Sequence, residues 1–485
     1  MNNSKALSAR ERIENLLDEK SFIEIGAAVH ARNTDFNMAG QNTASDGVIT
    51  GYGTINGNLV YVYSQDASVM GGSIGEMHAR KIDRMYDLAM KMGAPIIGMI
   101  DCSGIRLQEA TDALDGIGRL YMKQTMASGV IPQYTAVFGQ CGGSMAIMTA
   151  LSDITLMMKD NASLFVNSPN ALEGNIVTKL DTSASDFQSK VSGNADLVFE
   201  TEEALLTALK DLVCIMPQNL EDESIYCVEC RDDLNRHTND ISVIGDAGYA
   251  LELIADRHVV YELKPDHAPE MVTALMQIAG YTVGVVANRT EKLDAEGEIA
   301  ATYEPVLSAK GMKKAAKFVK LCDAFNIPVV TLVNVKGFEA TVEAEAENAQ
   351  AAAEMIGAFA NATTPKLSIV SGEAYGSAYL AMNAPHIGAD LVYAYPSAKI
   401  GMMDAKAAVK IMYQDEICSS EDPAALLSEK TAAYESIQSS PEAAAGRGYV
   451  DAVIEPEMTR QYIAAGIDML STKRESRPDK KHGTM

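Results

Sequence analysis

One sequence pattern occurs twice in this chain, and the duplication limits the folds open to it. Residues 93–105 and 131–145 align with residues 326–338 and 364–378, both at an offset of 233 residues. The aligned pairs are Pro95 with Pro328, Asp101 with Asn334, Gly104 with Gly337, Pro132 with Pro365, Gly139 with Gly372, Gly143 with Gly376 and Ser144 with Ser377. Upstream, Val60 aligns with Val283 at an offset of 223, which indicates a ten-residue difference in one loop.

The repeated unit alternates between strand and helix patterns. Residues 59–64 (LVYVYS) are rich in β-branched and aromatic side chains, which is typical of a strand. Residues 77–92 carry apolar side chains at helical spacing, and 95–100 and 134–139 are predicted strands. Alternating strands and helices predict an α/β fold, and the period far exceeds the roughly 20–50 residues of solenoid repeats. The chain is therefore predicted to be a duplicated α/β domain.

Length and local composition divide the chain in two. A length of 485 residues exceeds one ordinary core, so we expect an N-terminal domain over 1–235 and a C-terminal domain over 236–485. The polar, turn-rich residues 216–240 are predicted to be the linker. Residues 340–360 are rich in Ala and Glu, which predicts a helix with a solvated acidic face.

Charge and cysteine usage exclude several classes of protein. With 40 basic and 65 acidic residues the net charge is −25, which disfavours nucleic acids and anionic membranes as partners. The charged N-terminus lacks the apolar core of a secretion signal and no apolar run approaches a membrane span, so a cytoplasmic protein without direct membrane insertion is expected. Cys227 and Cys230 form a CxxC without a second matched pair, so ordinary thiols and no metal are predicted.

Each copy contains a predicted strand that runs into a glycine-rich turn and then a helix. These turns are Gly139–Ser144 and Gly372–Ala378. Helix N-termini leave backbone N–H groups unpaired, and small residues let a ligand approach them, so such turns suit a developing oxyanion. Strand–turn–helix junctions also need glycines for purely structural reasons, and spacing alone does not identify a substrate.

Beyond the repeat, ordered segments along nearly the whole chain resemble one protein family. They are residues 9–26, 46–66, 71–82, 92–114, 128–146, 317–338 and the closing KKHG at 480–483. In this order they are similar to the carboxyltransferase subunits of biotin-dependent acyl-CoA carboxylases and the alpha subunits of biotin-dependent acyl-CoA decarboxylases. The resemblance implies two duplicated crotonase-like (ClpP-like) ββα superhelix domains, in agreement with the repeat.

The resemblance also implies where the chemistry takes place. The N-terminal domain of one subunit would bind a coenzyme A thioester, and the C-terminal domain of a neighbouring subunit would bind biotin carried on a partner protein. The implied oxyanion residues are Gly142, Gly143, Gly376, Ser377 and Ala378. The implied substrate-binding residues are Ser103, Gly104, Tyr379 and Leu380, and Arg106 is a candidate for contact with the coenzyme A phosphates.

Some residues depart from the family pattern. The family commonly has glycine where this chain has Ser103 and Ser377, and the segment 404–408 also differs, which leaves the acyl specificity open. Residues 89–92 spell AMKM, the tetrapeptide in which biotin is attached to carrier domains. Because Lys91 ends a predicted amphipathic helix rather than an exposed turn, we expect biotin to arrive on a partner protein.

Several functions remain open at this stage. The first is an acyl-CoA carboxylase subunit acting on propionyl/methylmalonyl-CoA, or on acetyl/malonyl-CoA, with a biotin carboxyl carrier protein and a biotin carboxylase as partners. The second is the alpha subunit of a sodium-pumping decarboxylase with a membrane subunit as partner. The others are a non-catalytic scaffold that binds coenzyme A and a crotonase-type hydratase, although no acidic pair for a hydratase is evident. A homo-oligomer is expected if sites form between subunits.

Overall fold

The computed structural model describes residues 6–32, 36, 38, 40, 43–222, 230, 232–233, 235–238 and 241–479. The chain forms two compact units, Met1–Glu223 and Ser224–Met485. Their division falls inside the segment 216–240 that the sequence marks as the linker, although it lies before the predicted boundary at 235/236.

The N-terminal unit is built on an eight-stranded sheet. Its strands are β1 (Ile23–Glu24), β2 (Val48–Ile55), β3 (Asn58–Gln65), β4 (Ile96–Cys102), β5 (Gln133–Gly142), β6 (Ile154–Met158), β7 (Ser163–Phe165) and β8 (Leu197–Phe199). Its helices are α1 (Ala9–Leu16), α2 (Glu76–Met92), α3 (Ala110–Ala127), α4 (Ser144–Ala150), α5 (Asn175–Thr178) and α6 (Glu202–Ile215).

The C-terminal unit has a second eight-stranded sheet. Its strands are β9 (Val260–Leu263), β10 (Met271–Ile278), β11 (Tyr281–Asn288), β15 (Val329–Val335), β17 (Lys366–Tyr375), β18 (Leu391–Ala394), β19 (Lys399–Gly401) and β20 (Ala452–Val453). Short strands β12 (Glu291–Leu293), β13 (Ile299–Thr302), β14 (Val306–Leu307) and β16 (Gly337–Phe338) form two small additional sheets. Its helices are α7 (Ala247–Ile254), α8 (Ala309–Ala324), α9 (Val342–Asn361), α10 (Gly376–Ala381), α11 (Ala405–Met412), α12 (Gln414–Ser419), α13 (Pro423–Tyr434), α14 (Pro441–Ala445) and α15 (Thr459–Leu470).

The two sheets have the same strand order, which confirms the duplication. The first runs β1-β2-β3-β4-β5-β6-β8 with β7 beside β5, and the second runs β9-β10-β11-β15-β17-β18-β20 with β19 beside β17. In each sheet an antiparallel hairpin leads into parallel strands. The register also repeats, since Tyr61 pairs with Ile96 and Gly284 pairs with Val329, at the two offsets seen in the sequence.

The ten-residue difference between the copies also has a structural explanation. In the N-terminal unit β3 is joined to α2 by a short connection that contains one 3-10 turn. In the C-terminal unit the connection from β11 to α8 holds the β12–β13 hairpin and β14. The insertion is therefore a small antiparallel hairpin between strand β11 and helix α8 of the C-terminal copy.

Helix α2 illustrates how the sequence determines an element. Its apolar residues Ile82, Met85 and Ala89 are buried on one face. The helix ends at Gly93, whose left-handed conformation (φ 60°) lets its N–H donate to the Ala89 carbonyl. The acidic helix predicted over 340–360 is α9, and the Thr341 side chain caps it by accepting from the Ala344 N–H.

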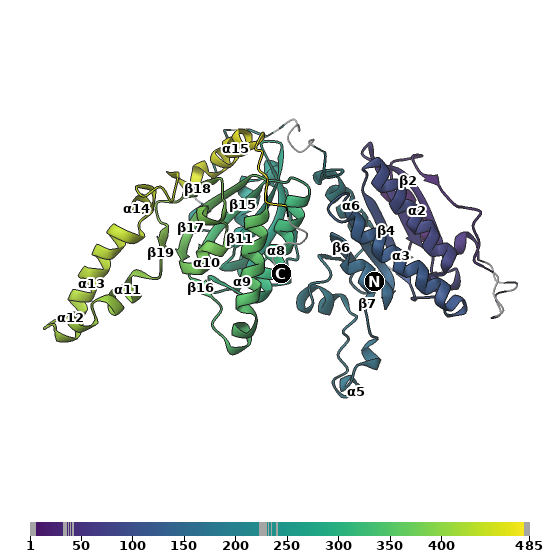
Figure 1. Cartoon of the computed structure of the whole chain (residues 1–485), viewed down its shortest axis with the longest axis horizontal. Helices are drawn as coiled ribbons and strands as arrows, with labels where there is room; N and C mark the ends of the chain where they lie inside the picture. The colour runs from purple at the N-terminus through teal and green to yellow at the C-terminus, as the bar shows by residue number, and fades with distance from the viewer. Residues whose placement is uncertain are drawn as a thin grey trace. The chain divides into compact units, whose positions relative to one another are not determined.

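Helices cover both faces of the C-terminal sheet (Figure 1). Val283 and Val285 of β11 belong to a buried core with residues of α7 and α15. Between them, Gly284 faces Cys322 and Phe318 of α8, because successive strand residues point to opposite sides. The core is thus a layered helix–sheet–helix arrangement, as an α/β fold requires.

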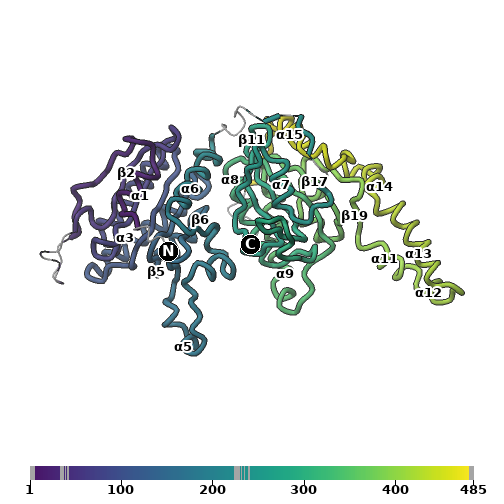
Figure 2. The backbone as a smooth tube through the Cα atoms, turned by 180° about the vertical axis from the view of Figure 1, so that it is seen from behind, coloured from purple at the N-terminus to yellow at the C-terminus, as the bar shows by residue number. Residues whose placement is uncertain are grey.

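Two segments extend from these layers (Figures 1 and 2). The helices α11 to α13 form an arm that leads away from the C-terminal sheet, and α5 lies on a long loop of the N-terminal unit. Helix α13 has no buried residue. Among the described residues, no helix is long and apolar enough to cross a membrane.

Candidate active site

The first predicted turn lies at the carboxyl end of β5, where α4 begins. Gly143 precedes α4 with φ 60° and ψ −119°, a backbone conformation that L-residues with a side chain rarely adopt. Its N–H donates to the Phe165 carbonyl of β7 at 2.8 Å. Gly142 is the last residue of β5 and pairs with Phe165, whose ring would lie 2.9 Å from a Cβ at Gly142.

The Gly143 N–H donates to the Phe165 carbonyl in this structure, and the oxyanion role predicted for Gly143 stays a prediction. The first turn of α4 begins at Ser144 and has no side-chain cap, and its Ala146 N–H donates to the Gly143 carbonyl at 3.1 Å. Oxyanion stabilisation by Gly142 stays a prediction.

Ser103 and Gly104 follow β4 at the same edge of the sheet. The Ser103 N–H donates to the Gly71 carbonyl at 3.0 Å, and the Gly104 carbonyl accepts from the Ile74 N–H at 2.9 Å. Ser103 is exposed, and Gly104 has a positive φ of 115°. The structure therefore joins two family segments, 71–82 and 92–114, through backbone hydrogen bonds.

Arg106 does not have the exposed position that a contact with coenzyme A phosphates requires. Its side chain is 0% exposed and its guanidinium forms ion pairs with Asp46 at 2.6 Å and Glu109 at 2.7 Å. It also donates to the Ser73 carbonyl at 2.8 Å. Buried charges need such partners, so Arg106 anchors the loop that carries Ser103 and Gly104. Asp46 and Ser73 are distant along the chain, so the sequence did not indicate that Arg106 is buried among these partners.

A buried histidine continues this network toward the end of β3. His78 Nδ1 lies 2.9 Å from the Asp46 carbonyl oxygen, and its Nε2 lies 3.2 Å from Gln65 Nε2. Burial, with the nearby Arg106, lowers the pKa of His78 to about 3. A neutral ring fits these contacts, with Nδ1 as donor and Nε2 as acceptor. His78 is therefore a structural residue, in line with the usual role of a lone histidine on a helix.

The second predicted turn begins α10 in the C-terminal unit. Gly376, Ser377 and Ala378 form the first turn of this helix, and no side chain caps it. Gly376 has a φ of +57°, and a Cβ there would lie 3.0 Å from the Met402 carbonyl oxygen. The three predicted residues therefore lie where helix amides are unpaired, and Ser377 is exposed.

Tyr379 and Leu380 lie on the same helix. Tyr379 is buried, and its hydroxyl has no hydrogen-bond partner in the described part of the chain. Burial raises the pKa of Tyr379 to about 12, so the hydroxyl stays protonated and can donate a hydrogen bond. Leu380 is half-buried. An unpaired buried hydroxyl is uncommon and fits the predicted substrate contact.

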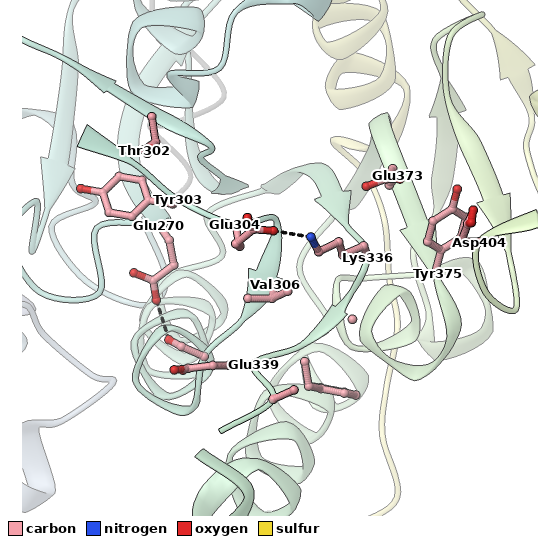
Figure 3. Close-up of a pocket in the computed structure, with 14 residues that line it drawn as sticks. Glu270, Thr302, Tyr303, Glu304, Val306, Lys336, Glu339, Glu373, Tyr375 and Asp404 are labelled. Atoms are coloured by element: carbon pink, nitrogen blue, oxygen red, sulfur yellow. Dashed lines mark hydrogen bonds and ion pairs between the residues drawn. The ribbon is translucent and has the colours of Figure 1, made fainter. Parts of the chain in front are cut away.

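A cleft of about 910 Å³ lies beside this turn in the C-terminal unit (Figure 3). Five carboxylates line it together with one lysine, two tyrosines and a phenylalanine. These lining residues are Glu270, Glu304, Glu339, Glu373, Asp404, Lys336, Tyr303, Tyr375 and Phe338. Lys336 forms an ion pair with Glu304, and Ser308 donates to Glu270. The cleft is thus predominantly acidic and partly aromatic.

Tyr375 connects the cleft to the predicted turn. It is the residue before Gly376, it is 5% exposed, and it lines the cleft. Burial, together with the negative charges of Glu373 and Asp404, raises the pKa of Tyr375 to about 12. Tyr375 and Glu373 were not among the residues predicted from the sequence, although both lie in the Gly372–Ala378 segment that the repeat marks.

Lys91 and Cys230 were not expected to carry biotin or a metal, and the structure shows their environments. Lys91 is exposed and lies in the last turn of α2, not at a β-turn. The Cys230 thiol lies 3.7 Å from an Asp256 oxygen, whereas Cys227 lies outside the described residues. Within the described ranges, no group of three or more His, Cys, Asp or Glu residues could hold a metal ion.

The duplicated α/β fold, with a helix N-terminus at the same strand end of each copy, has the crotonase-like architecture of acyl-CoA-handling enzymes. The carboxyl transferase domain family matches residues 3–485, and the chain belongs to this family. It is therefore an enzyme of the carboxyltransferase class.

Similar proteins cover almost the whole chain. The chain is 35% identical to the methylmalonyl-CoA decarboxylase subunit alpha of Propionigenium modestum, over 99% of this chain and 93% of the relative. It is 37% identical to the methylmalonyl-CoA carboxyltransferase 12S subunit of Propionibacterium freudenreichii subsp. shermanii, over 98% and 91%. The crystal structure of transcarboxylase 12S with methylmalonyl-coenzyme A and methylmalonic acid bound matches with a TM-score of 0.91 at 36% identity, and covers 98% of this chain and 91% of that one.

Proposed function

We propose that this chain transfers a carboxyl group between an acyl-CoA and biotin carried on a partner protein. Propionyl-CoA and methylmalonyl-CoA are the favoured pair, with acetyl-CoA and malonyl-CoA second. The observation that carries the proposal is the pair of helix N-termini without side-chain caps, at Ser144 and at Gly376, in equivalent places of the two units. A transfer between two carbonyl compounds needs two such electrostatic sites, one for each partner.

The N-terminal unit is proposed to hold the acyl-CoA. Its exposed Ser103, the positive-φ Gly104 and the first turn of α4 lie at the carboxyl ends of β4 and β5. There the amides would stabilise the thioester oxygen as negative charge develops on it. Two relatives that are 35% and 37% identical carry methylmalonyl-CoA in their names, which supports this acyl group.

The acidic cleft of the C-terminal unit is proposed to hold the biotin ring. Biotin is uncharged at its ureido group and presents N–H donors, for which Glu373 and Asp404 are suitable acceptors. Tyr375 and Phe338 add flat apolar surface for the bicyclic ring. Gly376, Ser377 and Ala378 would face the ureido oxygen. Bound there, biotin supplies the atom that accepts or gives up the carboxyl group.

The direction in the cell depends on partner proteins. A biotin carboxyl carrier protein and a biotin carboxylase would make the chain a carboxylase subunit. The 35% identity to a methylmalonyl-CoA decarboxylase subunit alpha supports the alternative, in which a membrane subunit is the partner. Both assignments place the same transfer reaction on this chain, in a cytoplasmic homo-oligomer.

An assay with free biotin tests the proposal. Purified chain is incubated with methylmalonyl-CoA or malonyl-CoA, with and without biotin and without added metal, and the loss of the acyl-CoA carboxyl group is followed. We expect biotin-dependent formation of propionyl-CoA, faster than formation of acetyl-CoA. Tight binding of both thioesters without any biotin-dependent loss would contradict carboxyl transfer.

A further inference from the structure

Both sheets contain the same irregularity between their two central strands. In the N-terminal unit the pairing moves from Ile100–Val137 to Cys102–Cys141, and in the C-terminal unit it moves from Val333–Val370 to Val335–Ala374. In both places the second strand has two more residues than the first. Such a break leaves backbone amides without ladder partners.

One side chain occupies each break. Asp101 Oδ1 accepts from the Gln140 N–H at 3.3 Å, and Asn334 Oδ1 accepts from the Glu373 N–H at 3.0 Å. The backbone N–H of Asp101 donates to Gln65 Oε1 at 3.3 Å. The equivalent bond runs from the Asn334 N–H to Asn288 Oδ1 at 3.1 Å.

A glycine makes room for each of these side chains. A Cβ at Gly139 would lie 2.0 Å from Asp101 Oδ1, and a Cβ at Gly372 would lie 2.5 Å from Asn334 Oδ1. We call each pair, Asp101 with Gly139 and Asn334 with Gly372, a strand-end clamp. This contact explains why the two pairs coincide in the aligned repeat.

Each clamp lies directly before the segments that carry the predicted site residues. Asp101 is two residues before Ser103, and Gln140 is two residues before Gly142. In the C-terminal unit, Glu373 and Tyr375 line the acidic cleft. The clamp side chains therefore bond to backbone that leads directly into the turns.

We propose that Asp101 and Asn334 are positioning residues, each of which fixes one oxyanion turn for one half of the transfer reaction. The assignment of one clamp to the acyl-CoA and the other to biotin rests on the proposed function. The charged side chain of Asp101 and the neutral side chain of Asn334 each fit their surroundings. Asp101 has a cation nearby, since Arg12 Nη1 lies 3.6 Å from its Oδ2, whereas Asn334 lies beside the acidic cleft, where another carboxylate would add repulsion.

The N-terminal clamp is tested by a double-mutant cycle in the free-biotin assay. Asp101→Ala is expected to lower kcat/KM for methylmalonyl-CoA about tenfold or more, because a small displacement of the turn misplaces the substrate. Asp101→Asn keeps the acceptor oxygen and should restore activity to within about threefold of wild type. Gly139→Ala should match Asp101→Ala by displacing the carboxylate, and the double variant should be no worse than either.

The C-terminal clamp gives the matched comparison. Asn334→Ala should raise the KM for biotin while leaving the KM for methylmalonyl-CoA within about twofold, and Asp101→Ala should do the reverse. Thermal unfolding and hydrogen exchange at the Gln140 amide separate a displaced turn from a damaged fold. Fully additive effects of Asp101→Ala and Gly139→Ala, or unchanged kinetics in all of the alanine variants, would overturn the clamp proposal.

The test also distinguishes failure of the proposed function. If wild-type chain shows no biotin-dependent activity, the proposed function fails while the N-terminal clamp is still testable by calorimetric binding of methylmalonyl-CoA. Weakened binding in Asp101→Ala, with recovery in Asp101→Asn, would support the clamp in that case. Equal binding by all three proteins would refute it.

Discussion

At the scale of single residues, the backbone conformation of Gly143 explains why this position needs glycine. Gly143 has φ 60° and ψ −119°, and a Cβ there would meet nothing within 4 Å. The requirement for glycine therefore comes from the backbone conformation and not from lack of space. A side chain at this position would be accommodated only by turning the peptide that donates to Phe165.

We therefore expect Gly143→Ala to lower kcat/KM for the acyl-CoA at least tenfold. The strain of a side chain in this conformation is about 1–3 kcal/mol, and relief of the strain would move the first turn of α4. Steady-state kinetics in the free-biotin assay, with thermal unfolding in parallel, measure both effects. Gly118→Ala is the matched control, because Gly118 lies in α3 without a positive φ and a Cβ there would meet nothing within 4 Å. The Gly118→Ala variant should keep full activity and gain about 0.5–1 kcal/mol of stability. Wild-type kinetics in Gly143→Ala would contradict the expectation that the conformation of Gly143 positions the first turn of α4.

At the scale of elements, the sequence was sufficient where one local pattern determines the structure. The α/β class, the helix at 77–92 with its stop at Gly93, and the acidic helix near 340–360 all follow from periodicity and capping. Strands that align at the two sequence offsets also pair in the same register in the structure. An internal repeat relates segments that are far apart in the sequence, whereas periodicity describes only one local segment.

The features that the sequence did not predict depend on contacts between segments that are distant along the chain. The partner of the Gly143 N–H is on β7, and the partners of Arg106 include Asp46, which is sixty residues away. Local sequence spacing indicates neither contact. The Gly143 amide was therefore expected to be free, and Arg106 was expected to be exposed. The acidic cleft was missed for the same reason, since its carboxylates come from several segments between Glu270 and Asp404.

A buried lysine at the same place in each repeat leads to a prediction about elements. Lys81 of α2 donates to carbonyls of Ser45 and Val48, and Lys314 of α8 donates to those of Lys264 and His267. Burial lowers the pKa of Lys81 to about 8 and that of Lys314 to about 7. Each lysine therefore attaches a helix to the segment that leads into the neighbouring hairpin.

Replacement of either lysine by methionine should destabilise its unit. Met fills a similar volume but leaves buried carbonyls without donors, which costs about 1–3 kcal/mol for each. We expect Lys81→Met and Lys314→Met each to lower the free energy of unfolding by at least about 2 kcal/mol, measured by chemical denaturation. Lys317→Met, on an exposed position of α8, is the control and should change it by less than about 0.5 kcal/mol. Equal stability of Lys314→Met and Lys317→Met would show that the buried contacts contribute nothing.

At the scale of the whole molecule, duplication gives two similar scaffolds that have diverged in charge. The N-terminal clamp uses Asp101 with Arg12 nearby, whereas the C-terminal clamp uses the neutral Asn334 beside an acidic cleft. An acidic cleft suits the uncharged biotin ring better than its carboxylated anion. Under the proposed function, this difference in charge would favour a different carbonyl compound at each turn.

The helical arm of the C-terminal unit leads to a prediction about assembly. Helix α13 buries none of its residues, and Ile411 and Met412 of α11 are 68% and 58% exposed. Short helices gain most of their stability from packing, so such an arm requires a covering surface, and a second copy of the chain is the simplest one.

We expect sedimentation velocity to show a species larger than the 51.9 kDa chain. Ile411→Glu with Met412→Glu should shift it toward the monomer and reduce biotin-dependent activity in parallel, whereas Lys410→Glu on the same helix should change neither. A wild-type chain that sediments only at 51.9 kDa under assay conditions, yet is fully active, would show that the arm needs no second copy and that one chain suffices for the reaction.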